Sequence, residues 1–170
     1  LDLNQDYLRY TGENVSATAG RHRINHGSQR FVGGVGWRQN EQTYDGVTFR
    51  AKPGVFDLSY SYVANVNRIF GPGDGAQPGD WHGNAHLFRG VVDLGKGHEA
   101  SGYGYVLDFE NANGVPNSTT TYGFEYSGEI GPVKVTVALA RQTDAGDSSL
   151  DYTASYQFVG ARIPVAKATL

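Results

Sequence analysis

Residues 55–67 read Val-Phe-Asp-Leu-Ser-Tyr-Ser-Tyr-Val-Ala-Asn-Val-Asn, and the order of polar and apolar side chains in this stretch decides the fold. Every second residue from Phe56 to Val66 is aliphatic or aromatic, and the residues between them are mostly Asp, Ser or Asn. Because successive side chains of a β-strand point to opposite faces of the sheet, this alternation predicts a strand with one apolar and one polar face.

The same period-two pattern returns along the rest of the chain and predicts nine strands. Clear strands are expected at residues 55–67, 99–110, 119–128, 133–142 and 150–158, and weaker ones at 3–10, 15–23, 42–51 and 85–93. The parity of the clear strands predicts which apolar side chains face outward. The predicted outward set is Leu58, Tyr60, Tyr62, Leu107, Phe109, Phe124 and Val135.

The connections between these strands are of two kinds. Tight turns containing Gly are expected at residues 52–54, 95–97 and 128–132. Longer connections rich in Gly, Asp, Asn and Ser are expected at 71–83, 111–118 and 143–149. Short turns at one end and long loops at the other are typical of an antiparallel up-and-down meander, which is how outer-membrane β-barrels are built.

Composition limits the classes of protein that remain. The chain has 170 residues with 24 Gly, no Cys and a formal net charge of −3, and we expect residues 1–170 to form a single domain. The absence of Cys excludes disulfides, zinc–thiolate sites and a cysteine nucleophile within these residues. The near-neutral charge gives no electrostatic footprint for nucleic acid, and no nucleic-acid partner is expected.

Strand length favours a membrane barrel over a soluble one. The clear strands run about 10–13 residues, whereas strands of soluble proteins usually have about 5–6 residues and a bilayer-spanning strand needs about 9–11. We therefore expect an all-β, antiparallel outer-membrane-type barrel or a fragment of one, with outer-membrane lipid as a partner. The alternative is a soluble or filament-forming structural β-subunit, without transport activity, whose tyrosine-rich faces pack against protein.

One block of sequence resembles a known family. Residues 19–25 read Ala-Gly-Arg-His-Arg-Ile-Asn, residues 29–33 read Gln-Arg-Phe-Val-Gly, and residues 36–45 read Gly-Trp-Arg-Gln-Asn-Glu-Gln-Thr-Tyr-Asp. This block resembles the signature region of the alginate-export family of outer-membrane porins. Residues 3–9 are similar to the strand that precedes the block in that family. The resemblance is specific over residues 3–68 and architectural beyond them.

The resemblance implies a barrel of about eighteen strands in the outer membrane of a Gram-negative bacterium. Such a barrel would pass solutes, among them an anionic exopolysaccharide such as alginate. Nine strands are half of that number, so the chain is expected to be a fragment of the larger barrel, which could self-associate, or a shorter barrel that closes on itself. The function expected from this resemblance is passive transport by a porin without a cofactor.

The sequence contains only weak candidates for metal-binding or catalytic motifs. His22 and His26, and again His82 and His86, have a spacing of four residues, which brings two imidazoles together on a helix but about 13 Å apart on a strand. The chain has no Gly-x-Ser-x-Gly motif and no recognisable catalytic triad. We therefore expect neither a metal site nor an enzyme.

Charged residues give the best candidates for a functional site. Arg30 and Arg38 flank a segment between strands that could fold into a lumen, and Arg50 lies on the polar parity of its strand. Guanidinium groups facing water bind carboxylates bidentately. The same arginines could instead pair with Glu41, Asp45 or Asp57 and hold the segment against the wall, and both roles stay open. The predicted lining set is Arg30, Arg38, Arg50, Asp45, Asp57 and Lys134.

A charge count complicates the expected cargo. By parity, two positive residues in the readable strands face the lumen against five negative ones. The positive residues are Arg50 and Lys134, and the negative ones are Asp57, Asp108, Glu110, Glu125 and Asp151. A conduit for a polyanion needs a positive constriction. We therefore expect Arg30 and Arg38, other loops or further strands to supply it.

Overall fold

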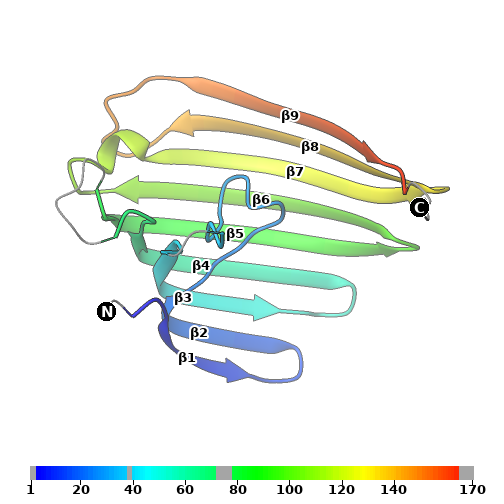
Figure 1. Cartoon of the computed structure of the whole chain (residues 1–170), viewed down its shortest axis with the longest axis horizontal. Helices are drawn as coiled ribbons and strands as arrows, with labels where there is room; N and C mark the ends of the chain where they lie inside the picture. Colours follow the sequence, from blue (N-terminus) through cyan, green and yellow to red (C-terminus); the bar gives the residue numbers. More distant parts are fainter. Residues whose placement is uncertain (1–2, 38–39, 72–77, 165–170) are drawn as a thin grey trace, which may run out of the picture.

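The computed structural model describes residues 3–37, 40–71 and 78–164, and it shows an all-β chain (Figure 1). The strands are β1 (Asp6–Thr11), β2 (Val15–His22), β3 (Thr43–Ala51), β4 (Phe56–Asn67), β5 (Asp80–Gly95), β6 (His98–Phe109), β7 (Thr119–Ile130), β8 (Val133–Asp144) and β9 (Thr153–Arg162). They form one antiparallel sheet in chain order, and a 3₁₀ turn at Val115–Asn117 precedes β7. The prediction of nine strands in an up-and-down meander is confirmed.

The sheet is open rather than closed into a barrel. Within the part of the chain that the structure describes, β1 is hydrogen-bonded to β2 alone and β9 to β8 alone. The alternative of a short barrel that closes on itself is therefore not what these residues form. Among the same residues, no helix has the length and apolar character that a membrane crossing requires.

The short turns lie at one end of the strands and the longer connections begin and end at the other, as predicted (Figure 1). Short turns join β1 to β2, β3 to β4, β5 to β6 and β7 to β8 at one end. Positive backbone φ angles at Gly95 and Gly97 allow the tight reversal between β5 and β6. The longer connections lie at the other end, so the sheet has a turn end and a loop end.

The connection between β2 and β3 does not stay at the loop end. Figure 1 shows that it crosses in front of the middle strands of the sheet. Ile24 and Val32 of this connection are each 4% exposed, and they share a hydrophobic cluster with Val63, Leu87 and Tyr105 from three strands. We call residues 23–37 the docked loop, the sheet face that it covers the loop face, and the opposite one the open face.

Strand register assigns each side chain to one of these faces. Ser59 of β4 lies opposite Arg89 of β5, which lies opposite Tyr103 of β6, and all three belong to the loop face. Their chain neighbours Tyr60 and Phe88 lie opposite each other on the open face. The open face keeps large side chains exposed on strands across the sheet. They include Leu8, Tyr10, Phe49, Phe56, Tyr60, Phe88, Val106, Tyr122, Phe124, Leu139 and Val159.

Two strands depart from the faces that parity predicts. Leu107 and Phe109 were predicted to face outward, but Phe109 is 4% exposed and Leu107 packs against the same core cluster. In β9, Tyr156 lines the loop face and Phe158 does the same. The prediction for Leu107 and Phe109 is wrong because the apolar side chains of β6 lie on the loop face, where they pack in the core between the sheet and the docked loop. Leu58, Tyr60, Tyr62, Phe124 and Val135 lie on the open face as predicted.

Candidate functional site

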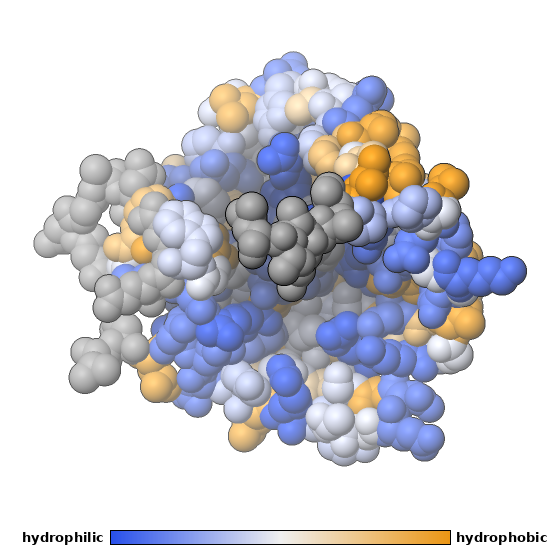
Figure 2. All heavy atoms as spheres, turned by 45° about the vertical axis from the view of Figure 1, so that its right-hand side comes forward, coloured by the Kyte–Doolittle hydropathy of each residue, from blue (hydrophilic) through white to orange (hydrophobic). Residues whose placement is uncertain are grey.

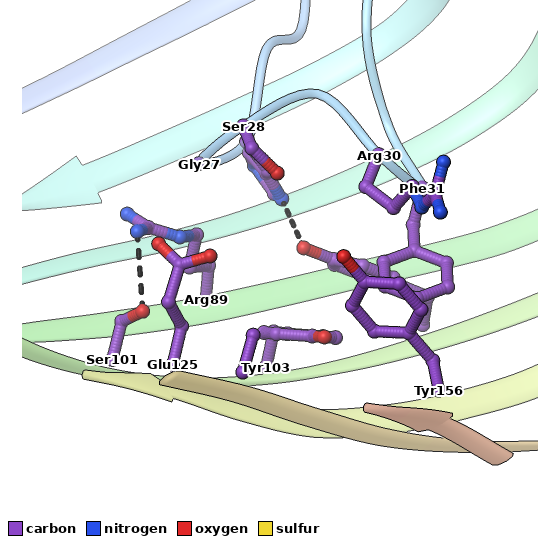
Figure 3. Close-up of a pocket in the computed structure, with 12 residues that line it drawn as sticks. Gly27, Ser28, Arg30, Phe31, Arg89, Ser101, Tyr103, Glu125 and Tyr156 are labelled. Carbon is purple, nitrogen blue, oxygen red and sulfur yellow. Dashed lines mark hydrogen bonds between the residues drawn. The ribbon is translucent and has the colours of Figure 1, made fainter. Parts of the chain in front are cut away.

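Arg89 of β5 lies near the middle of the loop face and is the centre of the candidate site (Figure 3). Its Nη2 atom donates a hydrogen bond of 3.2 Å to Oγ of Ser101 on β6. Glu125 of β7 lines the same pocket, and its carboxylate lies beside the guanidinium in the close-up. Arg89 is not recognisable as a site residue from the sequence, because the alternation of residues 85–93 is too weak to show which parity faces inward.

A cavity of about 310 Å³ lies between Arg89 and the first strands of the sheet, and we call it the arginine hollow. Its charged wall consists of Arg9, Arg23, Arg50, Arg89 and Asp57. Four guanidinium groups and one carboxylate therefore line the hollow, and because Arg23 also pairs with Glu41, Arg9, Arg50 and Arg89 supply its excess of positive charge over Asp57. Hydroxyl groups of Thr and Ser side chains complete the wall and offer further hydrogen bonds.

The contacts of these arginines show how the hollow is held together. Nη2 of Arg50 lies 2.8 Å from a carboxylate oxygen of Asp57, and Nζ of Lys52 lies 3.2 Å from the same oxygen. Nε of Arg9 donates a 3.0 Å hydrogen bond to Oγ1 of Thr18. Asp57 is thus shared by two cations, and the hollow keeps an excess of positive charge.

A second cavity, of about 970 Å³, opens on the other side of the docked loop toward the turn end. Its charged residues are Arg30, Arg89, Glu99, Glu125, Lys134 and Arg162. The rings of Tyr156 and Phe158 form the apolar part of its wall. In the space-filling view, hydrophilic residues occupy much of the middle of the molecule and hydrophobic residues gather in patches nearer its margin (Figure 2).

Aromatic rings of the docked loop and of the sheet pack together beside the Arg89 pocket and hold the docked loop in place (Figure 3). The Phe31 ring lies 5.7 Å from the rings of both Tyr103 on β6 and Tyr156 on β9. The Arg30 guanidinium lies over the Tyr156 ring at 4.8 Å, which is a cation–π contact. One short segment of the loop therefore touches strands that are three positions apart in the sheet.

Backbone and side-chain hydrogen bonds fix the other parts of the docked loop. The carbonyl of Gly33 accepts hydrogen bonds from Nε2 of Gln42 at 3.0 Å and from the Tyr44 hydroxyl at 2.9 Å. The His26 backbone N–H donates to the Val32 carbonyl at 3.1 Å. Arg23 forms an ion pair with Glu41 at the end of the connection. These bonds satisfy backbone groups that the sheet itself does not pair.

His26 joins the docked loop to the centre of the site. Its Nδ1 atom lies 3.1 Å from the Tyr105 hydroxyl. Burial, followed by the positive charges of Arg89 and Arg50, lowers the pKa of the His26 imidazole from its usual 6.5 to about 4. The imidazole is therefore neutral at pH 7, chiefly because it is buried, and the charges of Arg89 and Arg50 add to the effect.

The structure brings most of the predicted lining residues to the loop face. Arg50 and Asp57 line the arginine hollow, and Arg30 and Lys134 line the larger cavity. Asp45 lies instead on the open face, where both of its carboxylate oxygens bind Arg21 at 2.8 and 3.1 Å. Its register position opposite Arg21 in β2 explains this placement. Arg38 lies outside the described residues.

The balance of charge differs from the count made by parity. Asp57 and Glu125 line the loop face as expected, but Asp108 lies opposite Asn84 and shares the open face. Arg9, Arg30 and Arg89 line cavities of the loop face and were absent from the parity count. The loop face is therefore less acidic than the sequence count indicated.

The histidine pairs of the sequence do not act together. His22 contacts the Gly20 carbonyl and the Thr48 hydroxyl, whereas His26 contacts Tyr105. His86 lies 2.8 Å from the Tyr60 hydroxyl on the open face. In the described part of the chain, no three His, Cys, Asp or Glu side chains come close enough to hold a metal ion. The chemistry that the loop face offers is reversible binding of anions by guanidinium groups.

Comparison with known proteins adds no relative to this description: no family model, no curated protein and no solved structure matches the chain.

Proposed function

We propose that the chain forms part of the wall of an outer-membrane β-barrel porin, with the loop face lining an aqueous passage and the open face meeting lipid. The observation that carries the proposal is the difference between the two faces of one sheet. Large apolar side chains stay exposed on the open face, while charged side chains line cavities beneath the docked loop on the other. A membrane barrel requires this distribution of polarity.

The open face supports contact with lipid. Phe49, Phe88, Phe124 and Leu139 lie on four different strands and are 47–53% exposed. Adjacent rows of such side chains form an apolar surface that extends across the sheet. Soluble monomers rarely expose a contiguous apolar patch larger than a few hundred Å². Lipid would cover this surface without any change in the sheet.

The loop face supports a selective passage. The docked loop lies across the loop face, which would line the passage. In that position the loop would narrow the passage, as a constriction loop does. Arg30, Arg50 and Arg89 place positive charge on both sides of the loop. Fixed charges at a constriction select permeating ions by sign. The family resemblance implies an anionic exopolysaccharide such as alginate as cargo, and the positive charge of the arginine hollow favours anionic solutes.

A complete passage needs more strands than the nine described. The outer edges of β1 and β9 are unpaired within the described residues, and unpaired backbone groups cannot face the hydrocarbon core of a bilayer. Further strands of the same polypeptide, or of another copy, would pair with these edges. The proposed location is the bacterial outer membrane, in keeping with the resemblance.

Ion selectivity of the native polypeptide that contains these residues tests the proposal. In planar bilayers we expect channels whose reversal potential shifts toward cation selectivity in Arg50→Glu and Arg89→Glu. The shift should shrink as salt rises, because the Debye length falls from about 10 Å at 0.1 M to about 3 Å at 1 M. The matched control is Arg141→Glu, because Arg141 lies opposite Tyr122 on the open face.

Two results would contradict the proposed function. One is the absence of any channel from correctly folded protein. The other is an equal shift of reversal potential in Arg141→Glu and Arg50→Glu, because the face of the sheet would then not matter. A purely structural role of Arg50 predicts a lower folding yield with unchanged selectivity in the folded fraction, since Arg50 also binds Asp57.

The second candidate function is a structural β-subunit that assembles through its edges. The specific observation in its favour is the open sheet, because unpaired edge strands can pair with other chains. In that case the apolar open face would pack against protein rather than lipid. Filaments or large oligomers formed in plain buffer, without channel activity in bilayers, would support this candidate over the porin.

A further inference from the structure

His26 occupies the point where the docked loop meets the positive centre of the site. Its imidazole lies 3.1 Å from the Tyr105 hydroxyl, and the two rings are 5.5 Å apart. On either side of it in the chain, Ile24 and Val32 are buried in the core cluster that joins the loop to the sheet. A change at His26 therefore acts on the contact between the loop and the loop face.

Burial and two nearby cations oppose a positive charge on the His26 ring, and the cations are Arg89 and Arg50. Glu125, which lines the same pocket as Arg89, carries the opposite charge. His26 lines the arginine hollow and the pocket around Arg89 and Tyr103, and these bring titratable groups from eight strands and from the docked loop toward it. They are Arg9 of β1, His22 of β2, Arg50 of β3, Asp57 of β4, Arg89 of β5, Tyr103 and Tyr105 of β6, Glu125 of β7, Tyr156 of β9, and Arg23 and Arg30 of the docked loop.

We propose that the docked loop is an acid-responsive gate: protonation of His26 places a third cation beside Arg50 and Arg89 and releases the loop from the loop face. Release would remove Ile24 and Val32 from the core cluster and join the two cavities that the loop now separates. The proposal concerns the coupling between a proton and loop docking, and it does not depend on which solute passes.

The sign of the pH effect follows from the lowered pKa. His26 in the docked loop binds its proton less tightly than a histidine exposed to water, because its pKa is about 4 instead of 6.5. The docked state is therefore most stable above pH 6.5 and loses stability as the pH falls toward 4. If the released imidazole has its ordinary pKa, the ratio of docked to released loop falls by up to about 300-fold across this range.

A distance measurement between the loop and the sheet tests the gate directly. The chain contains no cysteine, so Ser28→Cys in the loop and Ser155→Cys on the open face of β9 provide two attachment points for nitroxide labels. Pulsed electron–electron resonance on the native polypeptide in detergent gives the label-to-label distance. We expect one narrow distance at pH 7 and a longer, broader distribution at pH 3.5.

Variants distinguish the effect of protonating His26 from the effect of protonating other groups in acid. His26→Gln keeps a hydrogen-bonding side chain that does not titrate, and we expect its distance to be the same at pH 7 and pH 3.5. Arg89→Gln removes a positive charge that disfavours protonated His26 in the docked state, so its loop should be released at lower pH than in the unsubstituted protein. His82→Gln is the matched control, because His82 is exposed beside Asp80 and should leave the transition unchanged.

Each outcome decides the proposal. An unchanged distance in the unsubstituted protein between pH 7 and pH 3.5 would overturn it, as would a full transition in His26→Gln. If His26→Gln already has a released loop at pH 7, the Arg89→Gln midpoint decides: a shift to lower pH supports the gate and an unmoved midpoint refutes it. Because the distance is read without any transport, failure of the porin proposal and failure of the gate are distinguishable.

Discussion

A single arginine, Arg89, organises the candidate site. It borders both cavities of the loop face, bonds to Ser101 on the next strand and contributes to the field that keeps His26 neutral. Its position on β5 is fixed by register, opposite Ser59 and Tyr103. Arg50, which was predicted from the sequence, lies in the same row of the loop face as Arg89, with Ser59 between them, and lines the same hollow.

Substitutions on one strand test which face meets lipid. Leu139 and Thr136 lie on β8, on the open face and the loop face respectively. If the open face meets lipid, Leu139→Arg near the bilayer midplane should cost about 2–4 kcal/mol of folding free energy, while Thr136→Arg should be nearly neutral. Reversible folding into lipid vesicles measures both values. Equal costs for the two variants would contradict the assignment of the faces.

At the scale of elements, the docked loop buries part of one face of the sheet, as a second layer of secondary structure does in a soluble sheet protein. It places Ile24 and Val32 against Val63 and Leu87, so this part of the loop face is buried as a small core. The aromatic contacts of Phe31 extend the attachment to β6 and β9. The docked loop is therefore packed on the sheet as part of the folded structure and does not extend away from it into solvent.

Removing one side chain of this core tests the attachment. Ile24 is 4% exposed, so Ile24→Ala should lower the free energy of unfolding by about 2–5 kcal/mol through lost burial and a residual cavity. Ile130 at the turn end is 64% exposed, and Ile130→Ala should change it by less than about 0.5 kcal/mol. Urea unfolding in detergent measures both. Similar small changes in the two variants would mean that the loop is not packed on the sheet.

A glycine shows how closely side chains approach the sheet on the loop face. A Cβ atom at Gly123 of β7 would collide with the Tyr103 ring, which lies over this glycine. Gly123→Ala should therefore displace Tyr103 and weaken its contact with Phe31. Near-ultraviolet circular dichroism and loop-to-sheet distances should both change. For comparison, Gly104→Ala should leave both unchanged, because a Cβ at Gly104 meets no atom within 4 Å.

At the scale of the whole molecule, the open face decides how the protein behaves in solution. Its exposed aromatic and aliphatic side chains span the sheet from β1 to β9. A porin wall should therefore need detergent or lipid to stay dispersed. Sedimentation of the native polypeptide with and without detergent checks this expectation. Monomers that stay dispersed in plain buffer would favour a soluble protein instead.

The class of fold, the nine strands and the separation of short turns from long connections can all be predicted from the order of residues along the chain. These features are local: alternation from Phe56 to Val66 and the glycines of the turns act through neighbouring residues. The alternation also separated the two sets of side chains on each strand. It could not show which set faces inward, because Leu107 and Phe109 carry the same pattern as Leu58 and Tyr60.

The position of the docked loop, the parity that it covers and the charges that meet beneath it depend on how the strands pair and pack. Arg89 comes close to Arg50 through strand pairing between residues far apart in sequence, and His26 reaches Tyr105 across 79 residues. Asp45 lies on the open face because it pairs in register with Arg21 of β2. These arrangements depend on non-local pairing and packing, and side-chain periodicity along one strand carries no information about either.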